Sequence, residues 1–148
     1  MEKLLSDDLI EQIRQLFEKL SKPVHVFLFI SSEKVEPCEP TRQLLEELIP
    51  LSDKLSLSVH DLDAEPDLAK LYSVQGKAPA IVIAAREGEQ ITDLGIRYLG
   101  VPSGHEFSTL IQDLILVSGR DSGLSPQVRK YIQELKEPLH LQVFVTPT

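Results

Sequence analysis

Apolar residues recur at helical spacing along the first twenty residues. The recurring positions follow Ser6 and are Leu9, Ile10, Ile13, Leu16, Phe17 and Leu20. Ser6 is a favourable N-cap residue, and Asp7 and Asp8 fall in the first turn, where the helix dipole favours negative charge. The pattern therefore predicts an amphipathic helix that ends before Pro23.

Short apolar runs further along the chain have the length and composition of strands. The β-branched and aromatic run from Val24 to Ile30 predicts a buried central strand, and Ala80–Ile83 predicts another buried strand. Apolar and polar residues alternate over residues 55–61, which predicts a strand with one covered face. The stretch from Thr92 to Tyr98 follows the turn sequence Arg86–Glu89 and predicts a further strand, so the last two strands form a hairpin.

Helical patterns separate these strands. After a loop from Ser31 to Pro37, a helix is expected to begin at Cys38–Thr41, and Pro66–Tyr72 predicts a short helix. Ser103 and Glu106 have the spacing of a capping box and predict the start of the last helix. The resulting order predicts an α/β fold, with a mixed central sheet that is flanked by helices on both faces.

The end of the chain repeats its beginning, 115 positions later. Seven identities share one gapless register: Leu9 and Leu124, Gln12 and Gln127, Arg14 and Arg129, Leu20 and Leu135, Pro23 and Pro138, His25 and His140, Phe29 and Phe144. Gly119–Gly123 has the composition of a linker. We therefore expect a first unit over residues 1–118, a linker over 119–124, and the first helix and strand of a second, truncated copy over 125–148.

The predicted second copy stops at the end of its first strand, at Val145–Thr148. We therefore expect the native protein to be longer than this chain. A lone strand carries unpaired backbone groups and apolar side chains, so it should pair with a sheet edge or promote association.

Composition and charge exclude several classes of partner. Of the 148 residues, 42% are apolar, which is enough for a buried core. The formal net charge of −8 disfavours binding to nucleic acid and to anionic membrane surfaces. The longest apolar run, Ala80–Ala85, is too short to span a membrane, and the N-terminus lacks a secretory core, so a cytoplasmic location is expected. No cofactor is expected, and no metal site either, because Asp61 and Asp63 have no further ligands at a useful spacing.

Cys38 is the single cysteine, so the chain alone cannot cycle between a dithiol and a disulfide. It falls at a predicted helix start, where unpaired N–H groups and the helix dipole favour a thiolate. Glu36 and Glu39 oppose this effect, and Lys34 offsets part of their charge. A buried structural thiol is the alternative role for this residue.

The order of these features resembles the thioredoxin fold, whose members carry Cys-x-x-Cys at a helix start and a cis-proline loop facing it. Cys38–Thr41 and Ala78-Pro79 match those two motifs in position. More narrowly, Gly95–Phe107 is similar to a segment typical of the tandem protein disulfide oxidoreductases, glutaredoxin-like proteins of thermophiles. In that family two such units follow each other, and the second active site comes directly after a strand that ends like Phe144–Thr148.

The resemblance implies a thiol-disulfide oxidoreductase unit with Cys38 as its sole nucleophile, in monothiol exchange or isomerisation. It implies that the main dithiol site lies in the missing second unit. Ala78 and Pro79 would then bind the substrate backbone, and Pro79 would be cis. The implied partners are protein thiols or disulfides and a thioredoxin reductase-like enzyme.

Thr41 departs from the family pattern, because it takes the position of the second, resolving cysteine. A mixed disulfide at Cys38 would therefore persist until an outside thiol displaced it. We expect either that the Thr41 hydroxyl donates a hydrogen bond to the Cys38 sulfur and favours the thiolate, or that Thr41 is simply a helix residue.

Two other functions compete with the oxidoreductase hypothesis. One is a redox-inactive binding or scaffolding unit, as is the first of two such folds in the related alkyl hydroperoxide reductase flavoprotein. The other is a monothiol glutaredoxin that binds glutathione or an iron–sulfur cluster. That group carries Gly-Phe-Ser after its cysteine, and Glu39-Pro40-Thr41 does not match it.

Overall fold

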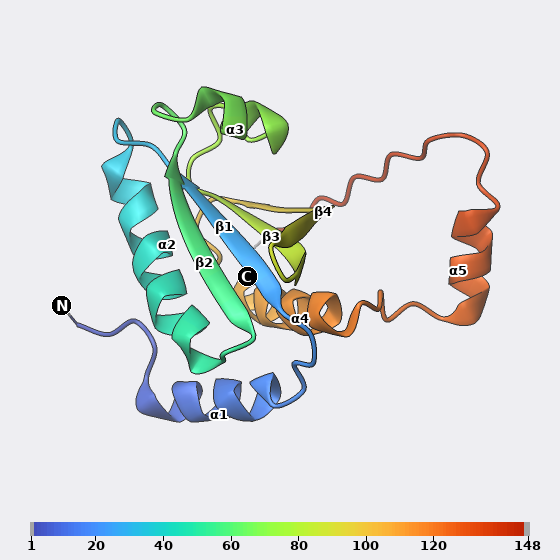
Figure 1. Cartoon of the computed structure of the whole chain (residues 1–148), viewed down its shortest axis with the longest axis horizontal. Coiled ribbons are helices and arrows are strands. Elements are labelled where there is room, and N and C mark those ends of the chain that lie inside the picture. Colours follow the sequence, from blue (N-terminus) through green and yellow to red (C-terminus); the bar gives the residue numbers. More distant parts are fainter. Residues whose placement is uncertain (1, 147–148) are drawn as a thin grey trace.

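The structure, a computed structural model, describes residues 2–146 (Figure 1). In chain order, the elements are α1 (Asp7–Phe17), β1 (Val24–Ile30), α2 (Val35–Leu48), a 3-10 helix η1 (Ile49–Leu51), β2 (Leu55–Asp61), α3 (Pro66–Leu71), β3 (Ala80–Glu87), β4 (Gln90–Leu99), α4 (His105–Gly119) and α5 (Pro126–Gln133). The predicted order of helices and strands is confirmed from α1 to α4. No helix in this range has the length and apolar character needed to cross a membrane.

The four strands form one mixed sheet in the order β2-β1-β3-β4. β1 pairs in parallel with β2 and antiparallel with β3, and β3 pairs antiparallel with β4. The parallel pair is possible because α2 carries the chain back along the sheet before β2 begins. β3 and β4 are joined by a tight turn at Gly88, whose φ of 63° suits a glycine. The predicted mixed sheet and hairpin are confirmed.

Side chains along β1 alternate between two apolar clusters, one on each face of the sheet. On one face they pack against side chains of α1, α2 and α4, and the β1 members of this cluster are Val24, Val26 and Leu28. On the opposite face, Phe27 and Phe29 pack against α3 and the segment that follows it. Helices therefore cover both faces, as the sequence predicted (Figure 1).

α2 begins at Val35, three residues before the predicted start at Cys38. The earlier start is possible because Pro37 takes the third helical position, where a backbone N–H has no partner within the helix. Cys38 is consequently the fourth residue of α2, and Pro40 lies inside the helix. The predicted loop is shortened to Ser31–Lys34.

The predicted capping box at the start of α4 does not form. The N-cap residue is Gly104, which makes no side-chain cap, and the Glu106 N–H donates to the Ser103 backbone carbonyl at 3.2 Å. Gly104 has φ 59° and ψ −126°, a conformation that glycine adopts far more readily than other residues. This turn moves Ser103 one residue away from the cap position, so its side chain cannot cap the helix.

Beyond α4 the chain only partly follows the prediction of a second copy. The expected helix is present as α5, and the Ser125 hydroxyl caps it by accepting from the Val128 N–H at 3.4 Å. The expected strand is not formed: residues 135–146 contain neither strand nor helix, and Phe144 is 89% exposed. A strand needs a neighbouring strand for its backbone hydrogen bonds, and α5 stands apart from the sheet (Figure 1). The predicted end of this copy, 147–148, lies outside the described residues.

Ser118 ties the end of α4 to the loop between α1 and β1. Its buried hydroxyl accepts from the Ser21 N–H at 2.8 Å and the Lys22 N–H at 3.1 Å, and donates to the Lys22 carbonyl at 2.7 Å. Ser118→Ala leaves these three backbone groups unpaired, so we expect the free energy of unfolding to fall by about 2–3 kcal/mol.

Urea denaturation measures this loss. Ser108→Ala, at an exposed position of the same helix, is the matched control and is expected to change the free energy of unfolding by less than about 0.5 kcal/mol. Equal values for the two variants would contradict the prediction.

Candidate functional site

Cys38 is the fourth residue of α2, the helix that follows β1, and lies near one end of the sheet. The residue is 4% exposed. A cavity of about 200 Å³ lies beside it, lined by Ile30, Ser31, Ser32, Val35, Cys38, Glu39, Arg42 and Asp61. A reaction partner must therefore reach the thiol through this cavity or after local opening of the structure.

The charges that line this cavity are of both signs. Glu39 and Asp61 are acidic, and the Arg42 guanidinium is basic. The Arg42 Nε donates to the Glu46 Oε1 at 2.8 Å, and this hydrogen bond is the main reason that the pKa of Arg42 is raised. Because both side chains are solvent-exposed, the ion pair contributes little to stability.

Thr41 is fully buried one helical turn after Cys38. Its hydroxyl donates to the Pro37 backbone carbonyl at 3.3 Å. A hydroxyl has one hydrogen to donate, so this hydrogen is not available to the Cys38 sulfur. Of the two roles expected for Thr41, the geometry matches a helix residue that bonds back to the preceding turn.

Asp61, the last residue of β2, forms another wall of the cavity, and the loop to α3 begins directly after it. The Ser31 hydroxyl donates to the Asp63 carboxylate at 2.8 Å, and the Asp63 N–H donates to the Asp61 carboxylate at 2.8 Å. The Glu65 N–H donates to the Asp61 carbonyl at 2.9 Å. These bonds hold the loop in a defined position beside the Cys38 cavity.

The peptide bond between Ala78 and Pro79, for which the resemblance implied the cis form, is cis. Pro79 directly precedes β3, whose first residue Ala80 pairs with Phe29 near the end of β1. The proline is therefore at the same end of the sheet as the start of α2. Its carbonyl accepts from the Gly100 N–H at 2.8 Å. Ala78 and Pro79 are not among the residues that line the Cys38 cavity.

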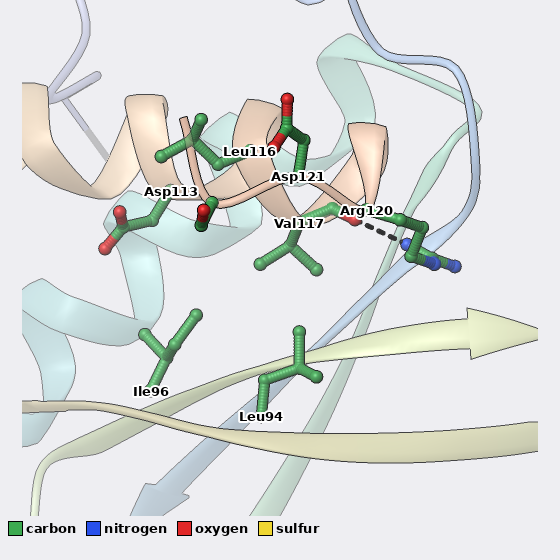
Figure 2. A pocket seen from close by; sticks show the side chains of 8 residues that line it. Leu94, Ile96, Asp113, Leu116, Val117, Arg120 and Asp121 are labelled. Carbon is green, nitrogen blue, oxygen red and sulfur yellow. Dashed lines mark hydrogen bonds between the residues drawn. The ribbon is translucent and has the colours of Figure 1, made fainter. Parts of the chain in front are cut away.

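A larger cavity lies elsewhere, and the sequence did not predict it. Its volume is about 460 Å³, and Figure 2 shows Leu94 and Ile96 of β4 facing Leu116 and Val117 of α4 across it. The two β4 residues share a strand face in the sequence pattern, but the pattern cannot show how far α4 lies from them. The lining contains no cysteine or histidine, so this cavity offers no thiol for exchange with a disulfide.

Sequence reasoning also missed a polar cluster on the sheet, formed by His25 of β1 with Ser56, Ser58 and His60 of β2. The alternation of these three β2 residues was visible, but their contact with His25 depends on strand register. Within residues 2–146, no group of three or more His, Cys, Asp or Glu residues is arranged to hold a metal ion.

No protein-family model matches the chain, but comparison with known proteins finds relatives. The chain is 29% identical over 145 residues to the alkyl hydroperoxide reductase protein AhpF of Staphylococcus aureus strain Mu50. The match covers 98% of this chain and 25% of the relative, so the chain spans about a quarter of the length of the curated relatives it matches.

Two solved structures are similar in fold. The NTD_N/C domain of alkyl hydroperoxide reductase AhpF from Enterococcus faecalis has a TM-score of 0.75 at 27% identity, covering 86% of this chain and 59% of that one. A protein disulfide oxidoreductase from Aeropyrum pernix has a TM-score of 0.75 at 24% identity, covering 88% of this chain and 55% of that one. The chain therefore has a thioredoxin-like fold and is homologous to the N-terminal domain of the alkyl hydroperoxide reductase protein AhpF.

Proposed function

We propose that this chain is a thioredoxin-like unit that exchanges thiols and disulfides with other proteins through Cys38. The observation that carries the proposal is the position of Cys38: it lies in the second turn of the helix that follows β1, beside a cavity of about 200 Å³. Sequence similarity to AhpF and a fold shared with a protein disulfide oxidoreductase support it.

The proposed reaction is a single exchange step. The Cys38 thiolate attacks one sulfur of a partner disulfide, the new S–S bond forms, and the partner's other sulfur leaves as a thiolate. Thr41 has no sulfur with which to displace the partner from Cys38. A thiol from outside residues 2–146 must therefore attack the mixed disulfide and release Cys38.

Ala78 and Pro79 are proposed to bind the backbone of the partner. Pro79 is buried and Ala78 is half-buried, at the end of the sheet that also carries the start of α2. The Pro79 carbonyl is already bonded to Gly100, so backbone groups of Ala78 are the better candidates for binding an extended peptide.

The surrounding protein is also part of the proposal. We propose that residues 1–118 are the first unit, 119–124 a linker, and 125–148 the start of a second unit that carries the main dithiol site. Identities between the two ends of the chain, such as Phe29 with Phe144, and the presence of α5 support this division. A thioredoxin reductase-like enzyme as a further partner and a cytoplasmic location complete the proposal.

A redox-inactive binding unit is the second candidate, and the burial of Cys38 favours it. At 4% exposure the thiol is nearly closed off from solvent, and Thr41 supplies no second sulfur. In this alternative the fold is retained as a docking module and Cys38 is a packing residue.

Reaction of Cys38 with 2-hydroxyethyl disulfide distinguishes the two candidates. Because Cys38 is the single cysteine, every mixed disulfide seen by mass spectrometry reports this residue. We expect the native protein to react, and to do so about tenfold or more slowly than the protein in denaturant. That ratio reflects the cost of exposing the thiol.

The control is iodoacetamide alkylation of the same samples, which tests access without requiring a disulfide. Alkylation and mixed-disulfide formation that occur only after denaturation would overturn the proposal and support the redox-inactive unit.

A further inference from the structure

A chain of hydrogen bonds runs across one face of the sheet, away from Cys38. His25 lies between two serines of β2: its Nδ1 is 2.7 Å from the Ser56 Oγ, and its Nε2 is 2.8 Å from the Ser58 Oγ. The Ser58 Oγ is also 2.9 Å from the Nε2 of His60. Two imidazole rings therefore share a single hydroxyl group.

Charged groups at both ends fix the direction of this chain. The Arg86 Nη1, which can only donate, is 3.2 Å from the Ser56 Oγ. The Nδ1 of His60 is 3.0 Å from a carboxylate oxygen of Glu65, which can only accept when ionised. His60 must therefore carry a hydrogen on Nδ1.

Counting hydrogens from the Glu65 end gives one arrangement for two neutral rings. With its hydrogen on Nδ1, neutral His60 has a bare Nε2, which accepts from the Ser58 hydroxyl. The Ser58 oxygen then accepts from the Nε2–H of His25. The bare Nδ1 of His25 accepts from the Ser56 hydroxyl, whose oxygen accepts from Arg86.

The chain can accept one added proton if the donor and acceptor of each hydrogen bond between His60 and Ser56 exchange roles. Protonated His60 donates from Nε2 to Ser58, and the Ser58 hydroxyl then donates to the Nε2 of His25. His25 moves its hydrogen to Nδ1 and donates to Ser56, whose hydroxyl turns to the Val24 carbonyl, 3.4 Å away. With a second proton, both imidazoles would be cations and both would donate to the Ser58 oxygen. The Ser58 hydrogen would then have no nitrogen acceptor.

The surroundings favour a charge on His60 over one on His25. Burial lowers the pKa of His25, and the positive charge of Arg86 and the proximity of His60 lower it further. His60 faces the Glu65 carboxylate, so its cation forms an ion pair. Tyr72 packs against Phe27 in a tilted geometry, with 4.6 Å between ring centroids, and the Arg97 guanidinium lies over the ring of Tyr72. Arg86 and Glu65 are the charged groups that hydrogen-bond to this chain.

We propose that His25 and His60 form a one-proton switch through Ser58, in which protonation of His60 changes the tautomer of neutral His25. The positive charge then lies beside Glu65, the residue that precedes α3, and converts a hydrogen bond from a neutral imidazole into an ion pair. His60 adjoins Asp61, which lines the Cys38 cavity. Because His60 and Glu65 lie at the two ends of the β2–α3 loop, their ion pair holds this loop more firmly at lower pH. The switch does not depend on the proposed chemistry of Cys38.

Nitrogen-15 NMR of histidine-labelled protein over a pH series tests the switch directly, because the shifts of Nδ1 and Nε2 distinguish both tautomers and the cation. We expect His25 to change from the Nε2–H to the Nδ1–H form at the same midpoint at which His60 becomes doubly protonated. An unchanged His25 tautomer through that midpoint, or simultaneous charging of both rings, would overturn the proposal.

Two variants separate the role of the Ser58 hydroxyl from its role in packing. Ser58→Ala removes the shared hydroxyl, so the tautomer of His25 should no longer follow the His60 midpoint. Ser58→Thr keeps the hydroxyl on a β-branched residue suited to a strand, and should preserve the coupling. The same His25 behaviour in both variants would contradict the proposal, even if both were less stable.

Discussion

Thr41→Cys is expected to give this chain a dithiol that closes to an intramolecular disulfide with Cys38. The variant should lose two hydrogens on mild oxidation and should catalyse the reduction of insulin disulfides by dithiothreitol. The parent chain, with its single cysteine, depends on dithiothreitol to release its mixed disulfide, so its turnover should be much slower. The difference is expected to be large, because the introduced thiol attacks the mixed disulfide within the same chain.

The local geometry supports this result. Thr41 lies three residues after Cys38 in α2, and residues three apart are neighbours on one helix face. Their Cα atoms are then within the range that a disulfide can bridge. Both residues are buried, so the introduced thiol lies next to Cys38 and is held away from solvent.

The cost of the substitution is a single hydrogen bond. The Thr41 hydroxyl donates to the Pro37 carbonyl, and a thiol is a weaker donor, so the reduced variant should lose about 1 kcal/mol of stability. Thr41→Val, which also removes the hydroxyl but supplies no sulfur, is the matched control. If Thr41→Cys stays fully reduced under conditions that oxidise thioredoxins, Cys38 does not occupy a thioredoxin-type active-site position.

The strands were predictable from the sequence because their signal is local. The run from Val24 to Ile30 is apolar except for His25, and β1 has the same bounds, since a central strand is covered on both faces. The alternation that predicted residues 55–61 likewise matches β2. The bounds follow from the pattern, but exposure in β2 does not alternate, because residues 56–61 are all half-buried.

Helix starts were less predictable, because they depend on the backbone conformation of one or two residues. Ser103 and Glu106 have the right spacing for a capping box, but the positive φ of Gly104 moves the helix start beyond Ser103. Pro37 appeared to belong to a loop, yet a proline fits the first turn of a helix without losing a hydrogen bond. Local composition allowed both outcomes.

The candidate site was predictable only as far as it lies along the chain. Cys38 follows from its position near a predicted helix start, whereas Thr41 and Pro79 were singled out by the resemblance to the thioredoxin fold. The shared hydroxyl of Ser58 could not be predicted, because the contact between β1 and β2 is set by register: Phe27 pairs with Ser58, and the two flanking imidazoles meet across that pair. A shift of one residue would break the hydrogen-bond chain.

The segment after α5 shows that a strand pattern in the sequence is not sufficient for a strand to form. Residues 139–145 repeat the pattern of β1, yet a strand pattern describes only the side chains and says nothing about a partner strand. Without one, Phe144 and its neighbours are exposed, whereas their counterparts in β1 are buried. The repeated sequence therefore provides two copies of one pattern in two different environments.

These two environments predict a large difference between equivalent substitutions. Phe29 is fully buried, with its ring centroid 5.6 Å from that of His60 and 5.8 Å from that of Tyr72. Phe29→Ala removes these contacts and leaves a cavity between the sheet and α3, so we expect the free energy of unfolding to fall by about 3–5 kcal/mol. Urea denaturation followed by far-ultraviolet circular dichroism measures the change.

Phe144→Ala is the matched control within the same chain, because Phe144 occupies the repeat position of Phe29 and is 89% exposed. Its expected cost is below about 0.5 kcal/mol. A cost of several kcal/mol at Phe144 would mean that the segment packs against the sheet or against another chain in solution, and repeating the measurement at several protein concentrations separates these cases. A small cost at Phe29 would instead show that the cluster between β1 and α3 contributes little to stability, and that the fold depends on the cluster formed with α1, α2 and α4.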